Sequence, residues 1–229
     1  YSYWGPGNSG GESETVLGNW LQRSGKRNQV ILATKLGKPM GEGKKGLSAR
    51  YMKEAVEASL KRLQTDYIDL YQSHMDNPET PIEETLESFS TLIRDGKVRV
   101  IGASNYSGTR LRESLQISRK NNLSMYESIQ PHYNLVQRSE YETETAPVVK
   151  EYGIGVIPYY SLASGFLSGK YRTLEDTEGK ARGAGAAKYI NTQGLRVLQA
   201  LDEVAEDYRA NPAQIALAWL IAQSGITAP

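Results

Sequence analysis

The feature that most constrains the fold of this chain is a regular alternation between short β-rich runs and longer stretches with helical periodicity. That order predicts βα units around a parallel sheet, because neighbouring parallel strands need a crossover and the crossover is usually a helix. Strands are expected at residues 30–33, 67–71, 98–102, 127–130 and 155–158, and another short run begins at Ile226.

The stretches between these runs have the spacing of amphipathic helices. Ser48 is expected to cap a helix whose Met52, Val56, Leu60 and Leu63 fall on one buried face. Further helices are predicted near residues 13–23, 81–94, 107–121, 140–152, 193–208 and 212–222. Periodicity alone does not separate an open doubly wound sheet from an interrupted barrel.

Length and charge narrow the class of protein. The chain has 229 residues, of which 39% are hydrophobic and 23% charged, as in an ordinary soluble globular protein. Lys and Arg (27) nearly balance Asp and Glu (26) and form no basic stripe, so a nucleic-acid partner is not expected. No apolar run approaches the roughly 20 residues of a membrane span, so no membrane partner is expected either. An oligomeric protein is compatible with the sequence.

The cysteine and histidine counts limit the chemistry. The chain has no cysteine, which excludes disulfides, thiolate catalysis and sulfur-ligated metals and is compatible with the cytoplasmic location that we expect. Two histidines cannot form a multi-histidine metal site, and no metal is predicted. Redox chemistry would therefore come from a bound cofactor.

Residues 5–10 spell G-x-G-x-x-G, the pattern of a dinucleotide-binding turn. Such a turn needs a hydrophobic strand before it and an acidic residue about 20 positions later, and neither is visible. We therefore interpret these residues as a loop, with Ser13 as the cap of the following helix. Glu12 and Glu14 are expected to interact with the dipole of that helix, and Asp69, inside a strand run, is expected to be structural.

Polar residues follow three of the predicted strands. Lys35, His74 and the pair Ser104 and Asn105 would all lie at the carboxyl edge of the sheet, where α/β proteins collect their reacting groups. Lys35 is a solvated charge, a Schiff-base former or a group that lowers a neighbour's pKa. His74 is a hydrogen-bonded structural histidine or a neutral imidazole that directs a carbonyl oxygen.

The segment after the predicted strand 155–158 suits a flat, phosphorylated ligand. Tyr159 and Tyr160 are packing residues or a platform for a ligand ring. Residues 161–170 follow with small side chains, backbone donors and a lysine, a composition that favours phosphate.

Together these segments resemble the aldo-keto reductases over nearly the whole length, in particular the bacterial branch that also resembles the cytoplasmic β subunits of voltage-gated potassium channels. Several motifs carry the resemblance in the right order. They are Tyr1, the Gly-Glu-Ser-Glu-x-x-x-Gly pattern at 11–18, Ala-Thr-Lys at 33–35, and the segments 59–63, 66–74 and 96–105.

The resemblance implies a (β/α)₈ TIM barrel, with residues 1–229 as one barrel domain. The chain opens on Tyr1 without a methionine and stops where the run at Ile226 has just begun. The expectation is a barrel that lacks its first strands and its last strand and helix, and so is incomplete at both ends.

The resemblance also implies a catalytic tetrad of Asp, Tyr, Lys and His. Tyr1 matches the general acid, Lys35 would stabilise its phenolate, and His74 would orient the carbonyl. The aspartate would lie just upstream and is absent from this chain.

By the same resemblance the cofactor is NADP(H). Ser104, Asn105 and Gln130 would bind the nicotinamide carboxamide, and Tyr159 would stack on the ring. The remaining cofactor residues would be Leu162, Gly165, Leu167, Ser168, Lys170 and Arg182. The family commonly has Tyr-Ser-Pro-Leu where this chain has residues 159–162, so Tyr160 is expected to alter that backbone. The usual selector for the 2′-phosphate would lie beyond Pro229, which makes NADP over NAD a family expectation.

Three functions are compared. The leading hypothesis is an NADP-dependent reductase that acts on a small aldehyde or ketone. The alternative is a cofactor-binding regulatory subunit with little activity, like the channel partners. A phosphate-binding isomerase or aldolase with Lys35 as Schiff-base former would leave the Gly-Glu-Ser-Glu and Ser-Asn segments without a role.

Overall fold

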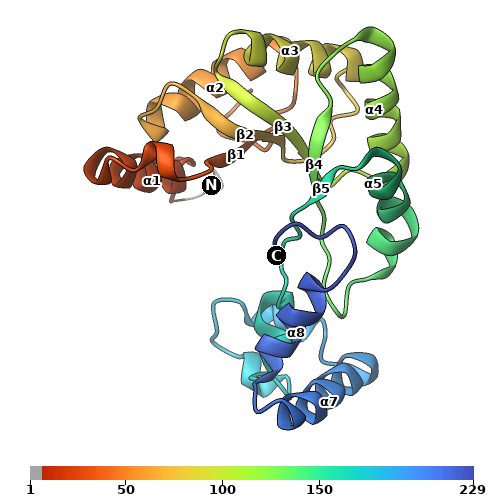
Figure 1. Cartoon of the computed structure of the whole chain (residues 1–229). Coiled ribbons are helices and arrows are strands. Elements are labelled where there is room, and N and C mark those ends of the chain that lie inside the picture. Colours follow the sequence, from red (N-terminus) through yellow and green to blue (C-terminus); the bar gives the residue numbers. More distant parts are fainter. Residues whose placement is uncertain (1–6) are drawn as a thin grey trace. The chain divides into compact units, whose positions relative to one another are not determined.

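The computed structural model describes residues 7–229 and divides into two compact units. The first unit ends at Ile129, and the second runs from Gln130 to Pro229. Figure 1 shows strands and helices alternating along the first, red-to-green part of the chain, whereas the blue part is mainly helical.

The first unit is built from βα units. Its strands follow one another in the sheet in chain order, and both β1–β2 and β2–β3 are parallel, as the alternation predicts. The elements are α1 (Glu12–Ser24), a short 3-10 turn (Arg27–Gln29), β1 (Ala33–Leu36), α2 (Ala49–Leu63), β2 (Ile68–Ser73), α3 (Ile82–Arg94), β3 (Val98–Ser104), α4 (Gly108–Asn121) and β4 (Tyr126–Gln130).

Two local predictions in this unit are wrong. The first strand was expected at 30–33 but begins at Ala33, because the Leu32 amide donates to the Asp69 carboxylate (2.9 Å). Helix α1 begins at Glu12 with Gly11 as its N-cap at φ 85°, so Ser13 is inside the helix. The predicted cap of α2 is confirmed, since the Ser48 side chain accepts a hydrogen bond from the Tyr51 amide.

The core of the first unit lies between the sheet and its helices. Met52, Val56 and Leu63 on α2 are fully buried, as the spacing predicts. Tyr71 on β2 and Tyr126 on β4 each contact the ring of Phe89 on α3 edge to face, at 6.1 Å between centroids. Edge-to-face contacts of this kind add to the energy of burial.

The opposite face of the sheet carries buried polar side chains. Gly102 on β3 pairs with Gln72 on β2, and a Cβ atom at Gly102 would overlap the Ser128 hydroxyl of β4. Glycine is therefore required here because two neighbouring side chains cross over the backbone.

The second unit has little strand and much helix. Its elements are a π-helical turn (Tyr141–Thr145), α5 (Ala146–Tyr152), β5 (Gly155–Val156), a 3-10 segment (Ala163–Ser168), a 3-10 turn (Glu175–Thr177), α6 (Gly183–Ala187), α7 (Thr192–Asp207) and α8 (Pro212–Ile221). The predicted strand 155–158 is shorter than expected.

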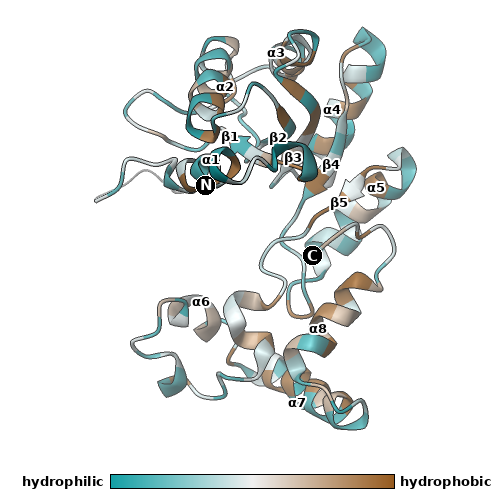
Figure 2. Cartoon of the chain, turned by 60° about the vertical axis from the view of Figure 1, so that its left-hand side comes forward, coloured by the Kyte–Doolittle hydropathy of each residue, from teal (hydrophilic) through white to brown (hydrophobic). Residues whose placement is uncertain are grey.

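The core of the second unit joins α7 and α8 to the segment after β5. Phe166, Leu167 and Leu198 are fully buried in it. Figure 2 shows brown, hydrophobic turns along α8, whose first turn is closed by a capping box between Asn211 and Gln214. The predicted run at Ile226 forms a parallel bridge with Val156.

No helix among residues 7–229 is long and apolar enough to cross a membrane.

Candidate functional site

The predicted catalytic residues of the first unit lie at the carboxyl ends of β1 and β2. Lys35 pairs with Gln72 in the parallel register, so both side chains project from the same face of the sheet. The His74 amide continues the ladder beyond β2 by donating to the Leu36 carbonyl (2.8 Å). Thr34 alternates to the other face, where its hydroxyl donates to Glu14 (2.6 Å). The strand pairing thus brings Lys35 and His74 to one edge.

The end of β3 joins the same edge. Ser104 is its last residue and is 1% exposed, and Asn105 follows in the left-handed region at φ 55°. The Asn105 amide nitrogen donates to the His74 carbonyl (2.9 Å) and to the Ser104 hydroxyl (3.1 Å). Asn105 therefore ties the chain at Ser104 to the chain at His74, a positioning role that the sequence pattern did not indicate.

Burial and neighbouring cations control the charges at this edge. Burial lowers the pKa of the Lys35 ammonium, and the charge of Lys38 lowers it further. Burial also lowers the pKa of His74 to about 3, with Lys38 and Lys35 contributing. Near neutral pH His74 is therefore an uncharged imidazole, which is the state needed to direct a carbonyl oxygen.

The lowered pKa of His74 makes stability depend on pH. An unfolded histidine takes up a proton as the pH falls through about 6.5, whereas folded His74 does so only near 3, so the fold loses stability across that window. Between pH 6.5 and 4.5 we expect the free energy of unfolding of the His74→Gln variant to fall by about 2 kcal/mol less than that of the natural protein. Urea unfolding at a series of pH values measures this difference.

The comparison has an internal control. Between pH 7 and 8 the difference in free energy of unfolding between the two proteins should stay nearly constant, because the histidine is mostly neutral in both the folded and the unfolded state. Asn105 contacts the backbone of His74, so the substitution leaves that hydrogen bond possible. Parallel stability curves between pH 6.5 and 4.5 would contradict the assignment of a neutral, buried imidazole.

The predicted phosphate segment of the second unit has an unusual backbone. Ala163 (φ 48°) and Ser164 (φ 59°) both adopt the left-handed region, followed by Gly165 at φ 93°. This conformation costs a residue with a side chain about 1–2 kcal/mol. Strain of this kind persists where the surrounding structure holds it, and it concentrates at binding sites. Here buried Ala163, Phe166 and Leu167 supply the support.

The hydrogen bonds of this segment change what its residues can offer. The amides of Gly165 (2.8 Å) and Leu167 (3.2 Å) both donate to the Leu162 carbonyl, and the Ser168 hydroxyl donates to the Gly165 carbonyl (2.7 Å). The Leu167 side chain is fully buried. The sequence suggested a row of donors open to a ligand, whereas these groups brace the loop itself.

Positive charge lies beside this braced loop. A Cβ atom at Gly165 would approach within 3.1 Å of Lys170 Cε, so the glycine lets the lysine side chain lie across the backbone. Lys170 also lies 5.0 Å from the centre of the Tyr171 ring. Arg182 is exposed at the start of α6. A glycine that admits a cation over a strained loop fits a phosphate-bearing cofactor.

Two further predicted cofactor residues belong to the second unit. Gln130 is half-buried at the end of β4, and Tyr159 is half-buried just after β5. Tyr160, where the family commonly has serine, adopts φ 56°. Its carbonyl accepts a hydrogen bond from Asn134 (2.9 Å), which holds this turn.

The predicted general acid, Tyr1, lies outside the described residues, and so do the first two residues of the G-x-G-x-x-G pattern at 5–10.

Glu14 has a larger role than the sequence suggested. It is 2% exposed and forms an ion pair with Arg62 (2.7 Å) in addition to its hydrogen bond with Thr34, so it is a buried link between α1, α2 and β1. Glu14 does lie in the first turn of α1, as the helix-dipole interpretation requires, but that interpretation missed its buried contacts with Arg62 and Thr34. Its spacing from Gly18 and Leu21, both buried, places it on the core stripe of α1, and that was the available signal.

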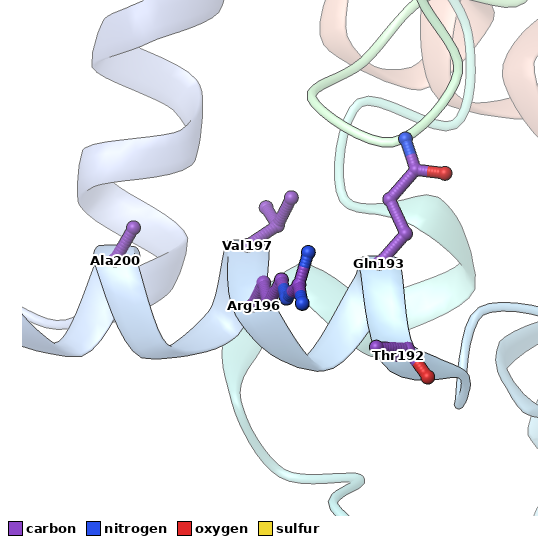
Figure 3. Close-up of a pocket in the computed structure, with 5 residues that line it drawn as sticks. All are labelled: Thr192, Gln193, Arg196, Val197 and Ala200. Carbon is purple, nitrogen blue, oxygen red and sulfur yellow. The ribbon is translucent and has the colours of Figure 1, made fainter.

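A hollow elsewhere in the second unit is separate from these residues. It measures about 550 Å³ and is lined along α7. Figure 3 shows its labelled residues, Thr192, Gln193, Arg196, Val197 and Ala200, all on one helix. A site lined by one helix face lacks the converging polar groups of a catalytic centre.

Comparison with known proteins decides the family. The profile of the Aldo/keto reductase family matches residues 1–229. The chain belongs to this family. Members are oxidoreductases of small molecules that generally use a nicotinamide cofactor, and membership implies a (β/α)₈ barrel. The parallel βα units of the first unit agree with part of such a barrel.

Three relatives illustrate the range of the family. The chain is 35% identical to the uncharacterized oxidoreductase YrpG of Bacillus subtilis over 99% of its own length and 70% of the relative. It is 37% identical to the aldo-keto reductase YhdN of the same organism, over 94% and 65%. It is 34% identical to a putative voltage-gated potassium channel subunit beta of Schizosaccharomyces pombe, over 93% and 65%. The chain thus spans about two thirds of the length of these relatives.

Proposed function

We propose that this protein is an NADPH-dependent reductase of small aldehydes or ketones. The observation that carries the proposal is the meeting of Lys35, neutral His74 and the Ser104–Asn105 pair at one sheet edge. We also propose that residues 1–229 belong to a single barrel domain, of which they form an incomplete part, and that the protein is cytoplasmic.

Tyr1 is the proposed general acid, which protonates the developing alkoxide. A free tyrosine has a pKa of about 10, too high for easy proton exchange near neutrality. The Lys35 ammonium stabilises the phenolate and lowers that pKa. Because burial weakens the hold of Lys35 on its own proton, a carboxylate beside it would keep it charged, as the family tetrad implies.

His74 is the proposed orienting group. As a neutral imidazole it carries one N–H donor, which binds the substrate carbonyl oxygen without competing as a second strong acid. Asn105 holds the backbone of His74 in place, so the direction of that hydrogen bond is set before substrate arrives.

The cofactor residues fall into two proposed groups. Ser104, Asn105 and Gln130 hold the nicotinamide carboxamide, and Tyr159 packs on the ring. Leu162, Gly165, Leu167 and Ser168 form the braced loop, and Lys170 and Arg182 supply the positive charge for phosphates. When bound, the reduced nicotinamide supplies the hydride. The choice of NADPH over NADH rests on the family resemblance.

The test compares the purified protein with its Tyr1→Phe variant, using an aromatic aldehyde and the loss of NADPH absorbance. We expect turnover in the protein and a 10²–10⁴-fold lower rate in Tyr1→Phe, the usual contribution of a general acid. NADPH binding without turnover would favour the alternative, a cofactor-binding regulatory subunit, for which the likeness to the S. pombe channel subunit is the supporting observation. Absence of NADPH binding would overturn both.

A further inference from the structure

His132, the histidine that the proposed mechanism does not use, stacks on Tyr159. The two rings lie 5.1 Å apart between centroids and only 15° from parallel. The backbone fixes this arrangement, since residues 132 and 159 form a parallel bridge and the Tyr159 amide donates to the Pro131 carbonyl (3.0 Å). Paired residues of parallel strands project to the same side, so the stack follows from the register.

A buried amide fixes the chain on both sides of the stack. Asn134 is fully buried, and its side-chain oxygen accepts from the amides of Val136 and Gln137 (3.0 Å each). Its nitrogen donates to the carbonyl of Tyr160 (2.9 Å) and lies 3.4 Å from His132 Nε2. One side chain thus joins the segment that follows His132 to the residue that follows Tyr159.

The imidazole in the stack is neutral near pH 7. Burial lowers the pKa of His132 and Lys188 lowers it slightly, whereas Glu140 acts in the opposite direction. Burying a neutral imidazole against a tyrosine face costs less desolvation energy than burying a charged one. Tyr160 contacts both rings edge to face, at 5.7 Å from His132 and 5.3 Å from Tyr159.

We infer that His132 is a positioning residue for Tyr159: it covers one face of the tyrosine ring and so fixes the plane on which a nicotinamide ring stacks. The inference rests on the proposed function, because it assumes that Tyr159 packs on the nicotinamide. Two features support it independently of activity. They are the near-parallel geometry of the two rings and the buried Asn134, which holds both chain segments. Fixing an aromatic ring before binding lowers the ordering cost of the complex.

The test separates the nicotinamide ring from the rest of the cofactor. The affinities of NADPH and of 2′-phospho-ADP-ribose, which lacks nicotinamide, are measured by calorimetry for the natural protein, His132→Ala and His132→Phe. We expect the alanine variant to bind NADPH about 5-fold more weakly, the worth of one aromatic stack, with unchanged affinity for 2′-phospho-ADP-ribose. The phenylalanine variant, which restores a flat ring, should recover NADPH affinity.

The other outcomes distinguish a failure of the positioning inference from a failure of the proposed function. Unchanged NADPH affinity in His132→Ala would show that the stack does not position Tyr159. If His132→Ala bound both ligands more weakly by the same factor, or if His132→Phe failed to recover NADPH affinity, His132 would have a general structural role. NADPH binding without aldehyde turnover in the natural protein would overturn the proposed reductase function and leave the positioning inference standing. No NADPH binding in the natural protein would overturn both.

Discussion

Replacing Asp69 with asparagine is expected to lower the free energy of unfolding by about 3 kcal/mol, the lower end for breaking a largely buried ion pair. The Asp69 carboxylate has a side-chain exposure of 11% and forms ion pairs with Arg27 (2.8 Å) and Arg99 (3.0 Å) while accepting the Leu32 amide (2.9 Å). Asparagine would leave Arg27, with a side-chain exposure of 15%, without its charge partner. Urea unfolding at neutral pH measures the loss.

Asp202→Asn provides the matched control. Asp202 pairs with Arg172 at 2.6 and 2.7 Å, but both side chains are more than two-fifths exposed, and exposed pairs contribute about 0–1 kcal/mol. Equal losses in Asp69→Asn and Asp202→Asn would contradict the argument from burial. Burial alone would raise the pKa of Asp69, yet the Leu32 amide and the two arginines hold that pKa below its usual value, which agrees with a net favourable cluster.

The second large effect is expected at Lys35. Changing Lys35 to methionine keeps a flexible chain of similar length but removes the ammonium, so the pKa of the proposed acid Tyr1 would stay near its ordinary value. We expect a 10²–10⁴-fold lower rate of aldehyde reduction, with NADPH affinity unchanged within about twofold. Steady-state kinetics and calorimetric titration measure the two quantities.

Lys120→Met is the control for Lys35→Met. Lys120 is exposed in the last turn of α4, so this substitution removes the same charge at a position away from β1. It should leave the rate unchanged. If Lys35→Met retained the natural rate, Lys35 would have no part in the chemistry. If its rate fell in parallel with its thermal stability, the lysine would be structural.

Much of the local structure could be predicted because it depends on neighbours in the sequence. The face of Met52, Val56 and Leu63 is buried as its spacing predicts, and Ser48 caps that helix. The strand end that carries His74 could be predicted as well, since an apolar run ends there, whereas Lys35 was expected after its strand and lies within β1. The family motifs lie in these same segments, which is why the family could be identified from the sequence.

The errors arose where a distant residue competes with the local pattern. The first strand begins at Ala33 because Asp69, far along the chain, takes the Leu32 amide. The position of Glu14 near the start of a helix is typical of a helix-dipole partner. Its contacts with Arg62 and Thr34, however, make it a buried link between α1, α2 and β1. The amides of Gly165 and Leu167 and the hydroxyl of Ser168 look open in the sequence, yet they donate to the carbonyls of Leu162 and Gly165.

The sequence by itself determined the order of βα units, the helix faces and the residue types at the strand ends, because these follow from periodicity and from contacts between near neighbours. Tertiary structure alone decided the partners of Asp69, the tie from Asn105 to His74 and the stack of His132 on Tyr159. A buried polar or aromatic group is stable only with a partner of matching geometry, and in a parallel sheet the strand register supplies that partner from a distant segment.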